Sequence, residues 1–147
     1  MKKTAMITIS EAEWEIMRVV WANVTVTSRQ VIDILTEKMD WKESTIKTLI
    51  GRLVDKDALK TEKEGRRFIY SANISEQETV KSYSEEILDR VCDTKDVLVA
   101  QHIIRDANLS QSNIQELILL LEEKAKSAPE DVLCDCTPGQ CDCHLTT

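Results

Sequence analysis

Residues 41–70 read WKESTIKTLIGRLVDKDALKTEKEGRRFIY, and this stretch decides the fold. In its first part, apolar residues recur at helical spacing, which predicts an amphipathic helix that begins within residues 41–44. Its second part holds two short segments typical of strands, Leu59–Lys63 and Arg66–Tyr70. Between them lies Gly65, which tolerates the positive φ that a tight turn needs. The stretch therefore predicts a helix followed by a β-hairpin.

Two further helices are predicted before this stretch. Ser10 and Glu13 form a capping-box pattern, and apolar residues then recur at helical spacing to about Asn23. Thr27 or Ser28 can cap a second helix with its own apolar stripe. Three helices followed by a basic β-hairpin is the order of a winged helix-turn-helix domain, whose third helix enters the major groove of DNA. The sequence thus predicts a mainly α chain with an α+β, winged-helix DNA-binding domain over residues 1–72.

The polar side of the third helix and the second strand of the hairpin hold the predicted DNA contacts. Hydroxyl and cationic side chains suit phosphates and base edges. The alternative is a solvated helix surface, but the hairpin and the family resemblance given below favour DNA contact. The predicted DNA-binding residues are Ser44, Thr45, Lys47, Thr48, Arg52, Arg66 and Arg67.

Charge is divided unevenly along the chain. Residues 1–71 carry a net charge of +2, and residues 72–147 carry −9. Contact with phosphate depends on the local patch and not on the total of −7, so the acidic composition does not exclude nucleic acid as a partner.

The sequence after Ser75 predicts amphipathic helices, with a break and a cap at Asn108–Ser110. These helices have apolar residues but too few of them for a globular core of their own. Such a face most simply packs against the same surface of a second chain. We therefore expect a helical dimerisation domain over residues 73–127 and a homodimer.

Four of the five cysteines lie in the last fourteen residues, as two Cys-x-Cys pairs four residues apart. Each pair presents two sulfurs, and Thr137–Gln140 carries the Pro-Gly turn signal that returns the second pair onto the first. Sulfur-only coordination favours Zn(II) in a tetrahedron or Cu(I). Residues 128–147 are thus predicted to form a flexible metal-binding tail. Its expected ligands are Cys134, Cys136, Cys141 and Cys143.

Three other features limit the functions that the sequence allows. Cys92 stands apart from the tail in sequence, and we expect it to be a small buried residue and not a ligand. The first residues lack the apolar core of a signal peptide, so a cytoplasmic location is expected, where thiols bind metals more often than they form disulfides. The two histidines lie far apart, and no nucleophile, base and acid come together in the sequence, so an enzyme is not expected.

Three segments resemble the penicillinase-repressor family, which includes the BlaI, MecI and CopY repressors: SEAEWEIMRVVW at 10–21, WKESTIKTLIGRL at 41–53 and EGRRFIY at 64–70. The resemblance covers residues 7–126, and the cysteine tail resembles the copper-responsive CopY branch. It implies a dimeric repressor whose zinc-loaded form binds an inverted-repeat DNA operator of copper homeostasis genes. Cu(I) would displace zinc from the tail and release the DNA, and a copper chaperone could donate the Cu(I).

Two alternatives remain open from the sequence. The first is a winged-helix repressor in which the tail holds a purely structural zinc ion and another signal causes induction. The second is a cytosolic copper buffer or carrier, whose basic front docks on a protein partner. Binding to duplex DNA, and its dependence on copper, distinguishes the three interpretations.

Overall fold

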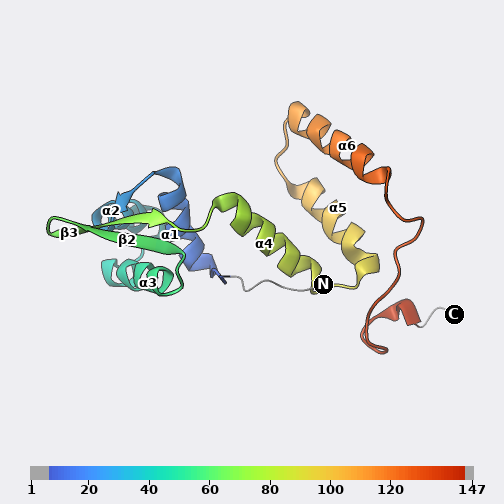
Figure 1. Ribbon diagram of the computed structural model, residues 1–147, viewed down its shortest axis with the longest axis horizontal. Coiled ribbons are helices and arrows are strands. Elements are labelled where there is room, and N and C mark those ends of the chain that lie inside the picture. The colour runs from blue at the N-terminus through green and yellow to red at the C-terminus, as the bar shows by residue number, and fades with distance from the viewer. Residues whose placement is uncertain (1–6, 145–147) are drawn as a thin grey trace. The chain divides into compact units, whose positions relative to one another are not determined.

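The computed structural model describes residues 7–144 of the chain (Figure 1). The chain divides into two compact units, Met1–Ser82 and Tyr83–Thr147. The first unit contains three helices and a small sheet, whereas the second is helical and ends in the cysteine-rich segment. Within the described range, no helix combines the length and the apolar character needed to cross a membrane.

Helix α1, Glu11–Ala22, begins at a capping box. The Ser10 hydroxyl accepts a hydrogen bond from the Glu13 backbone N–H at 3.1 Å, and the Ser10 N–H donates to Glu13 Oε1 at 2.9 Å. These bonds satisfy backbone donors that would otherwise be free at the start of the helix. The chain leaves the helical conformation at Asn23, as predicted from the sequence.

Helix α2, Ser28–Met39, follows the short strand β1, Val26–Thr27. A second capping box starts it: the Gln30 N–H donates to Thr27 Oγ1 at 3.2 Å, and the Thr27 N–H donates to Gln30 Oε1 at 2.8 Å. Asp40 ends the helix in the left-handed region, with φ of 56°, a conformation that Asp adopts more readily than most residues.

Helix α3, Glu43–Asp55, is the predicted third helix. It begins within the expected range even though Lys42, its N-cap residue, makes no side-chain capping bond. One side of the helix is buried and the opposite side is exposed, as its apolar spacing requires. The buried residues are Ile46, Leu49, Ile50 and Leu53.

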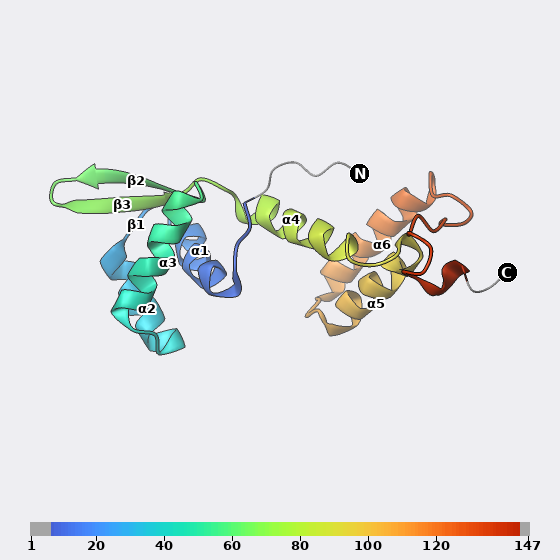
Figure 2. The same cartoon turned by 90° about the horizontal axis from the view of Figure 1, so that it is seen from below.

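The predicted hairpin consists of β2, Leu59–Glu64, and β3, Arg67–Ala72, which pair antiparallel with Glu64 opposite Arg67. Gly65 lies in the turn with φ of +67°, the conformation for which glycine was expected. Strand β1 pairs with the other edge of β3, so the order is β1-β3-β2. Figures 1 and 2 show the hairpin extending beside α3, and this arrangement confirms the winged-helix fold.

The core of the first unit lies where α1, α2 and α3 pack together against the base of the sheet. Beside it, the Glu13 carboxylate is 1% exposed and accepts a hydrogen bond from Lys56 Nζ at 2.6 Å. Trp21 Nε1 donates to the Ile74 carbonyl at 2.9 Å, which ties α1 to the chain after β3. The core residues are Ile16, Met17, Val19, Val20, Val26, Val31, Ile32, Leu35, Ile46, Leu49, Ile50, Leu53, Ala58 and Leu59.

The second half of the chain is a series of helices. Helix α4, Glu76–Leu88, crosses the boundary between the units, and the short 3-10 helix η1, Asp93–Lys95, leads directly into α5, Asp96–Asp106. Helix α6, Gln111–Ala125, follows, and η2, Asp142–His144, is part of the cysteine-rich segment.

The predicted break before α6 is confirmed. Ser110 caps the helix: its hydroxyl accepts from the Asn113 N–H, and its own N–H donates to Asn113 Oδ1, both at 3.1 Å. The local sequence therefore ends α5 and starts α6 without help from distant residues.

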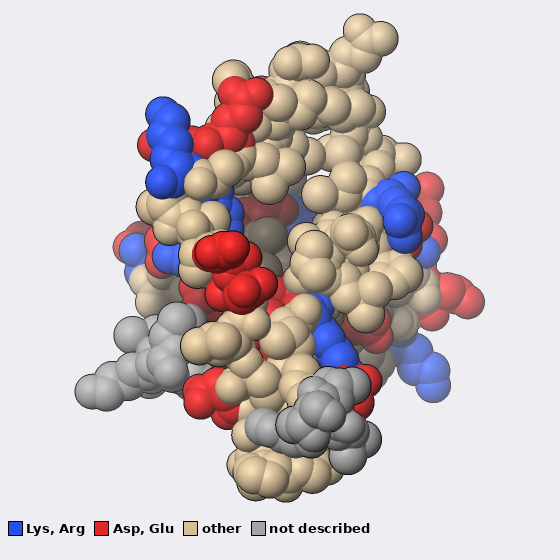
Figure 3. All heavy atoms as spheres, turned by 90° about the vertical axis from the view of Figure 1, so that its right-hand side faces the viewer, with Lys and Arg blue, Asp and Glu red and all other residues tan. Residues whose placement is uncertain are grey.

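Helices α5 and α6 expose most of their large apolar residues. Leu119 is 64% exposed and Leu120 is 62% exposed. Figure 3 shows wide areas of uncharged residues, between which acidic and basic side chains lie beside one another in several places. The exposed apolar residues of these two helices are Val97, Leu98, Ile103, Ile104, Ile114, Ile118, Leu119, Leu120 and Leu121.

Candidate nucleic-acid interface and metal centre

The exposed side of α3 carries five of the seven predicted DNA-binding residues. All five side chains face solvent, while the apolar side of the same helix is packed into the core. A helix with this division can enter a DNA groove without uncovering the core of its own domain. These residues are Ser44, Thr45, Lys47, Thr48 and Arg52.

The start of α3 is held by polar contacts. Arg29 on α2 forms an ion pair with Glu43, and this pairing raises the pKa of the Arg29 guanidinium. Further along, the Thr48 hydroxyl donates to the Ser44 carbonyl at 3.0 Å. The Thr48 oxygen therefore has a fixed direction and retains lone pairs that can accept a hydrogen bond.

The other two predicted DNA contacts, Arg66 and Arg67, lie at the tip of the hairpin and are exposed. Among the described residues, Arg67 forms a weak ion pair with Glu64, with an N–O separation of 3.7 Å between two exposed side chains. Both guanidinium groups can therefore reach an approaching phosphate at little cost.

An open groove of about 490 Å³ separates the exposed side of α3 from the hairpin. Lys47 and Gly51 line it from the helix, and Thr61 and Phe68 line it from the strands. A Cβ atom added at Gly51 would meet no atom within 4 Å, so glycine here leaves open space on the groove wall. Phe68 is 50% exposed and was not among the predicted site residues, although its place in the basic hairpin was a usable signal.

The cysteine-rich segment folds back on itself through the predicted turn. The Gln140 N–H donates to the Thr137 carbonyl at 3.0 Å, and Gly139 adopts φ of +97°. This turn brings Cys141 Sγ to 3.2 Å from Cys134 Sγ. The two Cys-x-Cys pairs thus come together as their spacing predicts.

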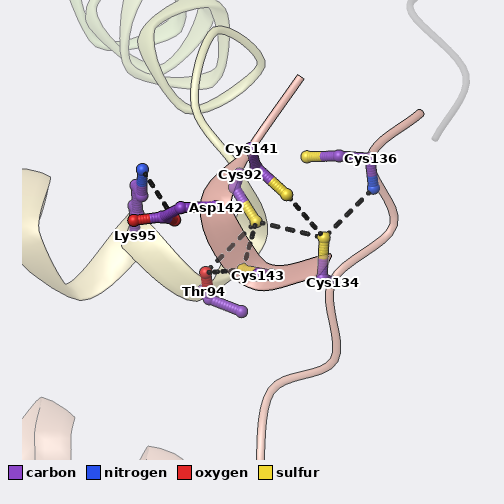
Figure 4. A network of polar contacts seen from close by, with 8 residues as sticks. All are labelled: Cys92, Thr94, Lys95, Cys134, Cys136, Cys141, Asp142 and Cys143. Carbon is purple, nitrogen blue, oxygen red and sulfur yellow. Dashed lines mark hydrogen bonds and ion pairs between the residues drawn. The ribbon is translucent and has the colours of Figure 1, made fainter. Parts of the chain in front are cut away.

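A fifth cysteine lies against the segment, although it is distant from the segment in sequence. Cys92 is buried, as predicted, but its sulfur lies 3.5 Å from Cys134 Sγ and 3.7 Å from Cys143 Sγ (Figure 4). Cys92 is therefore close to the tail in space, and the expectation that it is not a ligand stays a prediction. No local sequence pattern predicts this contact, because Cys92 and Cys134 are 42 residues apart.

The sulfurs of four cysteines lie within 4.8 Å of one another: Cys92, Cys134, Cys136 and Cys141. Cys143, the remaining predicted ligand, is outside this set and contacts Thr94 Oγ1 at 3.3 Å. An ion pair between Lys95 Nζ and Asp142 Oδ1, at 3.4 Å, joins η1 to the same segment.

Hydrogen bonding divides the pKa values of the five thiols. The hydroxyl and backbone of Thr94 lower the pKa of Cys92 to about 6, and the sulfur of Cys92 in turn raises the pKa of Cys136 to about 11. The pKa of Cys141 is lowered, chiefly by its hydrogen bond with Cys134. The cluster therefore favours thiolate at Cys92 and Cys141, the form of cysteine that binds metals.

The donor set fits a soft metal ion. Zinc–sulfur bonds of about 2.3 Å in a tetrahedron place the sulfurs about 3.8 Å apart. Within the set of four, the distances between the sulfurs of Cys92 and Cys134, 3.5 Å, and of Cys134 and Cys141, 3.2 Å, are close to that separation. Thiolates also suit Cu(I), whereas Mg(II) and Ca(II) prefer oxygen ligands.

The chain is similar in sequence to several known proteins. The sequence pattern of the penicillinase repressor family matches residues 9–123. The chain is 49% identical to an uncharacterised 16.5 kDa protein of Latilactobacillus sakei from the ptsI 3′ region, over 92% of this chain and 93% of that protein. It is 35% identical to the penicillinase repressor of Bacillus licheniformis, over 78% and 90% of the two chains. A solved CopR repressor structure is 40% identical over 44% of this chain and 94% of that chain, with a TM-score of 0.40.

Proposed function

The chain belongs to the penicillinase repressor family, and we propose that it is a copper-responsive transcriptional repressor. In this proposal a zinc-loaded homodimer binds an inverted-repeat operator of copper homeostasis genes, and Cu(I) binding releases the DNA. The single observation that carries the metal response is the convergence of four cysteine sulfurs within 4.8 Å. Two relatives are named as a penicillinase repressor and a methicillin resistance regulatory protein, and the proposal assigns no catalytic activity.

Support for DNA binding comes from the first unit. The exposed side of α3 and the arginines of the hairpin present hydroxyl, ammonium and guanidinium groups on the two elements that a winged-helix domain places on DNA. We assign Lys47 and Arg52 to phosphates or guanine edges, and Arg66 and Arg67 to the phosphate backbone or the minor groove.

Support for the homodimer comes from the second unit. Helices α5 and α6 expose apolar side chains that a single chain leaves in water. Packing this surface against its own copy removes it from solvent and produces a two-fold axis. Two DNA-binding domains related by such an axis require an operator with inverted half-sites.

The cysteines supply the sensor in this proposal. Thiolates bind Zn(II) as a tetrahedron, whereas the same thiolates bind Cu(I) more tightly and with fewer ligands per ion. The sulfurs of Cys134 and Cys141, one from each Cys-x-Cys pair, lie 3.2 Å apart. A metal ion that prefers a different coordination geometry would therefore change how the two pairs are arranged.

Net charge does not provide the switch. Four thiolates with one Zn(II), and four thiolates with two Cu(I), both carry a net charge of −2. We therefore propose that the cysteine segment changes its packing within the dimer, and that this change moves the two DNA-binding domains relative to each other.

The test is a fluorescence-anisotropy titration of the zinc-loaded protein onto an inverted-repeat operator at fixed salt, followed by addition of Cu(I). We expect release of the DNA by Cu(I) in the wild type. The matched control replaces Cys134 and Cys136 with serine, and release should then be lost.

Each other outcome selects an alternative. Operator binding that does not change when Cu(I) is added would favour a repressor with a structural zinc site. Tight Cu(I) binding without specific DNA binding would favour a copper buffer or carrier. A cytoplasmic location, and a copper chaperone as the donor of Cu(I), stay predictions that this titration does not address.

A further inference from the structure

We propose that Cys92 is a zinc ligand and that Cys143 lies outside the zinc site. The inference rests on the proposed metal-binding function and changes its ligand set. Zinc would be held by Cys92, Cys134, Cys136 and Cys141, so one ligand comes from the helical body of the second unit and three come from the cysteine-rich segment.

The distances support this assignment. Cys92 Sγ is 3.5 Å from Cys134 Sγ, and Cys134 Sγ is 3.2 Å from Cys141 Sγ, which approach the sulfur separation of about 3.8 Å in a zinc tetrahedron. Figure 4 shows the sulfurs of Cys92, Cys134 and Cys141 pointing toward one another. The sulfur of Cys143 lies 3.7 Å from that of Cys92 and 3.3 Å from Thr94 Oγ1, but Cys143 is not among the four cysteines whose sulfurs all lie within 4.8 Å of one another.

The surroundings of Cys92 are those of a ligand and not of a core residue. Cys92 is 7% exposed, but it is not part of the cluster of buried apolar residues in the first unit. Its sulfur lies close to polar groups, the hydroxyl of Thr94 and the sulfurs of Cys134 and Cys143. A cysteine that served only as a small apolar residue would not require such neighbours.

A second contact independently brings the segment to the same place. Lys95, three residues after Cys92, pairs with Asp142 at 3.4 Å. This pair is exposed and contributes little free energy by itself, but it is a further contact between η1 and the cysteine-rich segment. With both contacts, the segment is joined to the residues between α4 and α5.

The assignment has a consequence for signalling. Cys92 is the N-cap residue of η1, which leads directly into α5, a helix with exposed apolar residues. A metal ligand at this position connects metal exchange to a helix of the proposed dimer surface. A site made from Cys134, Cys136, Cys141 and Cys143 alone would have no ligand next to α5 in sequence.

The experiment measures which cysteines zinc protects from N-ethylmaleimide in the full-length protein, with peptide mapping by mass spectrometry. With one zinc bound, we expect alkylation of Cys134, Cys136 and Cys141 to slow by at least about tenfold relative to the metal-free protein, while Cys143 keeps its metal-free rate. In Cys92→Ser, Cys143 should become protected, because its sulfur lies 3.7 Å from that of Cys92 and can take its place. In Cys143→Ser, the three other segment cysteines should stay protected.

The outcomes separate this inference from the proposed function. Protection of Cys143 in the zinc-loaded wild type, with unchanged protection in Cys92→Ser, would overturn the assignment of Cys92 and leave the metal-responsive repressor intact. Absence of zinc protection at every cysteine would overturn both. The wild-type measurement decides the question even if a variant folds poorly.

Discussion

The two units of the chain use similar apolar residues in opposite ways. The first unit buries fourteen apolar residues in one cluster, whereas Cys92 is the one fully buried residue among the described residues of the second unit. A closed core makes the DNA-binding unit complete within one chain. The helices of the second unit leave their apolar residues exposed, which is the condition expected of a surface that a partner covers.

Buried carboxylate oxygens also differ between the two units, in whether they have hydrogen-bond partners. In the first unit, Glu13 Oε1 accepts hydrogen bonds from the Ser10 N–H and from Lys56 Nζ. In the second unit, Asp96 Oδ1 is buried and has no hydrogen-bond partner within the described residues, and burial raises the pKa of this carboxyl group. A buried polar atom without a partner is unusual in a finished interior, so this difference also indicates that the second unit is incomplete alone.

The largest expected effect tests whether the second unit needs a partner. Replacing Leu119 and Leu120 with aspartate puts four charges into a two-fold interface, so we expect the dimer dissociation constant to rise at least about a thousandfold, or roughly 4 kcal/mol. Sedimentation equilibrium measures this constant. Val24→Asp, at a 91% exposed position of the first unit, is the control and should leave the dimer unchanged. An undiminished dimer in the double variant would show that these residues are not at the interface.

The next effect tests the closed core of the first unit. Ile46 is fully buried, and Ile46→Ala should lower the free energy of unfolding by about 3 kcal/mol through lost burial and a cavity. Urea unfolding followed by tryptophan fluorescence measures this unit selectively, because Trp14, Trp21 and Trp41 all lie in it.

The matched control makes the same chemical change at Ile118, which is 40% exposed on α6. Ile118→Ala should alter the fluorescence-detected transition by less than about 0.5 kcal/mol. Equal destabilisation by the two variants would mean that the units unfold together. The buried core of the first unit would then not stabilise that unit separately from the second.

A smaller effect concerns the buried carboxylate. Glu13→Gln removes a charged partner of Lys56, so we expect a loss of about 2 kcal/mol in the free energy of unfolding near neutral pH. Burial by itself would raise the pKa of Glu13, but hydrogen bonds from Lys56 and Ser10 outweigh it and lower the pKa.

The sign of the pH dependence follows from that lowered pKa. The carboxylate stabilises the fold fully above the pKa of the unfolded chain, about 4.3, and this contribution is lost as the pH falls through the lower, folded-state value. The difference between the wild type and Glu13→Gln should therefore shrink below about pH 4 in urea titrations. Glu64→Gln, which breaks an exposed pair with Arg67, should show neither the loss nor the pH dependence.

The smallest effect tests the functional division between the units. Lys47→Ala should weaken operator binding about tenfold and reduce the slope of log K against log salt by about two, one phosphate contact for each chain of the dimer. Anisotropy titrations at several salt concentrations measure both quantities. Lys124→Ala on α6 removes the same charge from the second unit and should leave the slope unchanged. An equal change in both variants would indicate a general charge effect and not a contact from α3.

Much of the fold could be predicted from local sequence. The capping boxes at Ser10 and Ser110, and the turn at Gly65, each satisfy backbone groups within a few residues, so they define helix starts and the hairpin without distant partners. The turn at Thr137–Gln140 is equally local, and it brings the two cysteine pairs together as expected. The predicted DNA contacts on α3 are exposed because helical periodicity places them opposite the buried side.

The sequence by itself determined the winged-helix unit, the helical second half and the convergence of the cysteine pairs, because periodicity, capping and turn chemistry act over short distances along the chain. Only the tertiary structure placed Cys92 beside Cys134, since that contact joins residues 42 positions apart and depends on how η1 meets the cysteine-rich segment. The tertiary structure also decided which apolar residues have partners within the chain and which remain exposed on α5 and α6. Burial is a property of packing, and composition alone does not specify it.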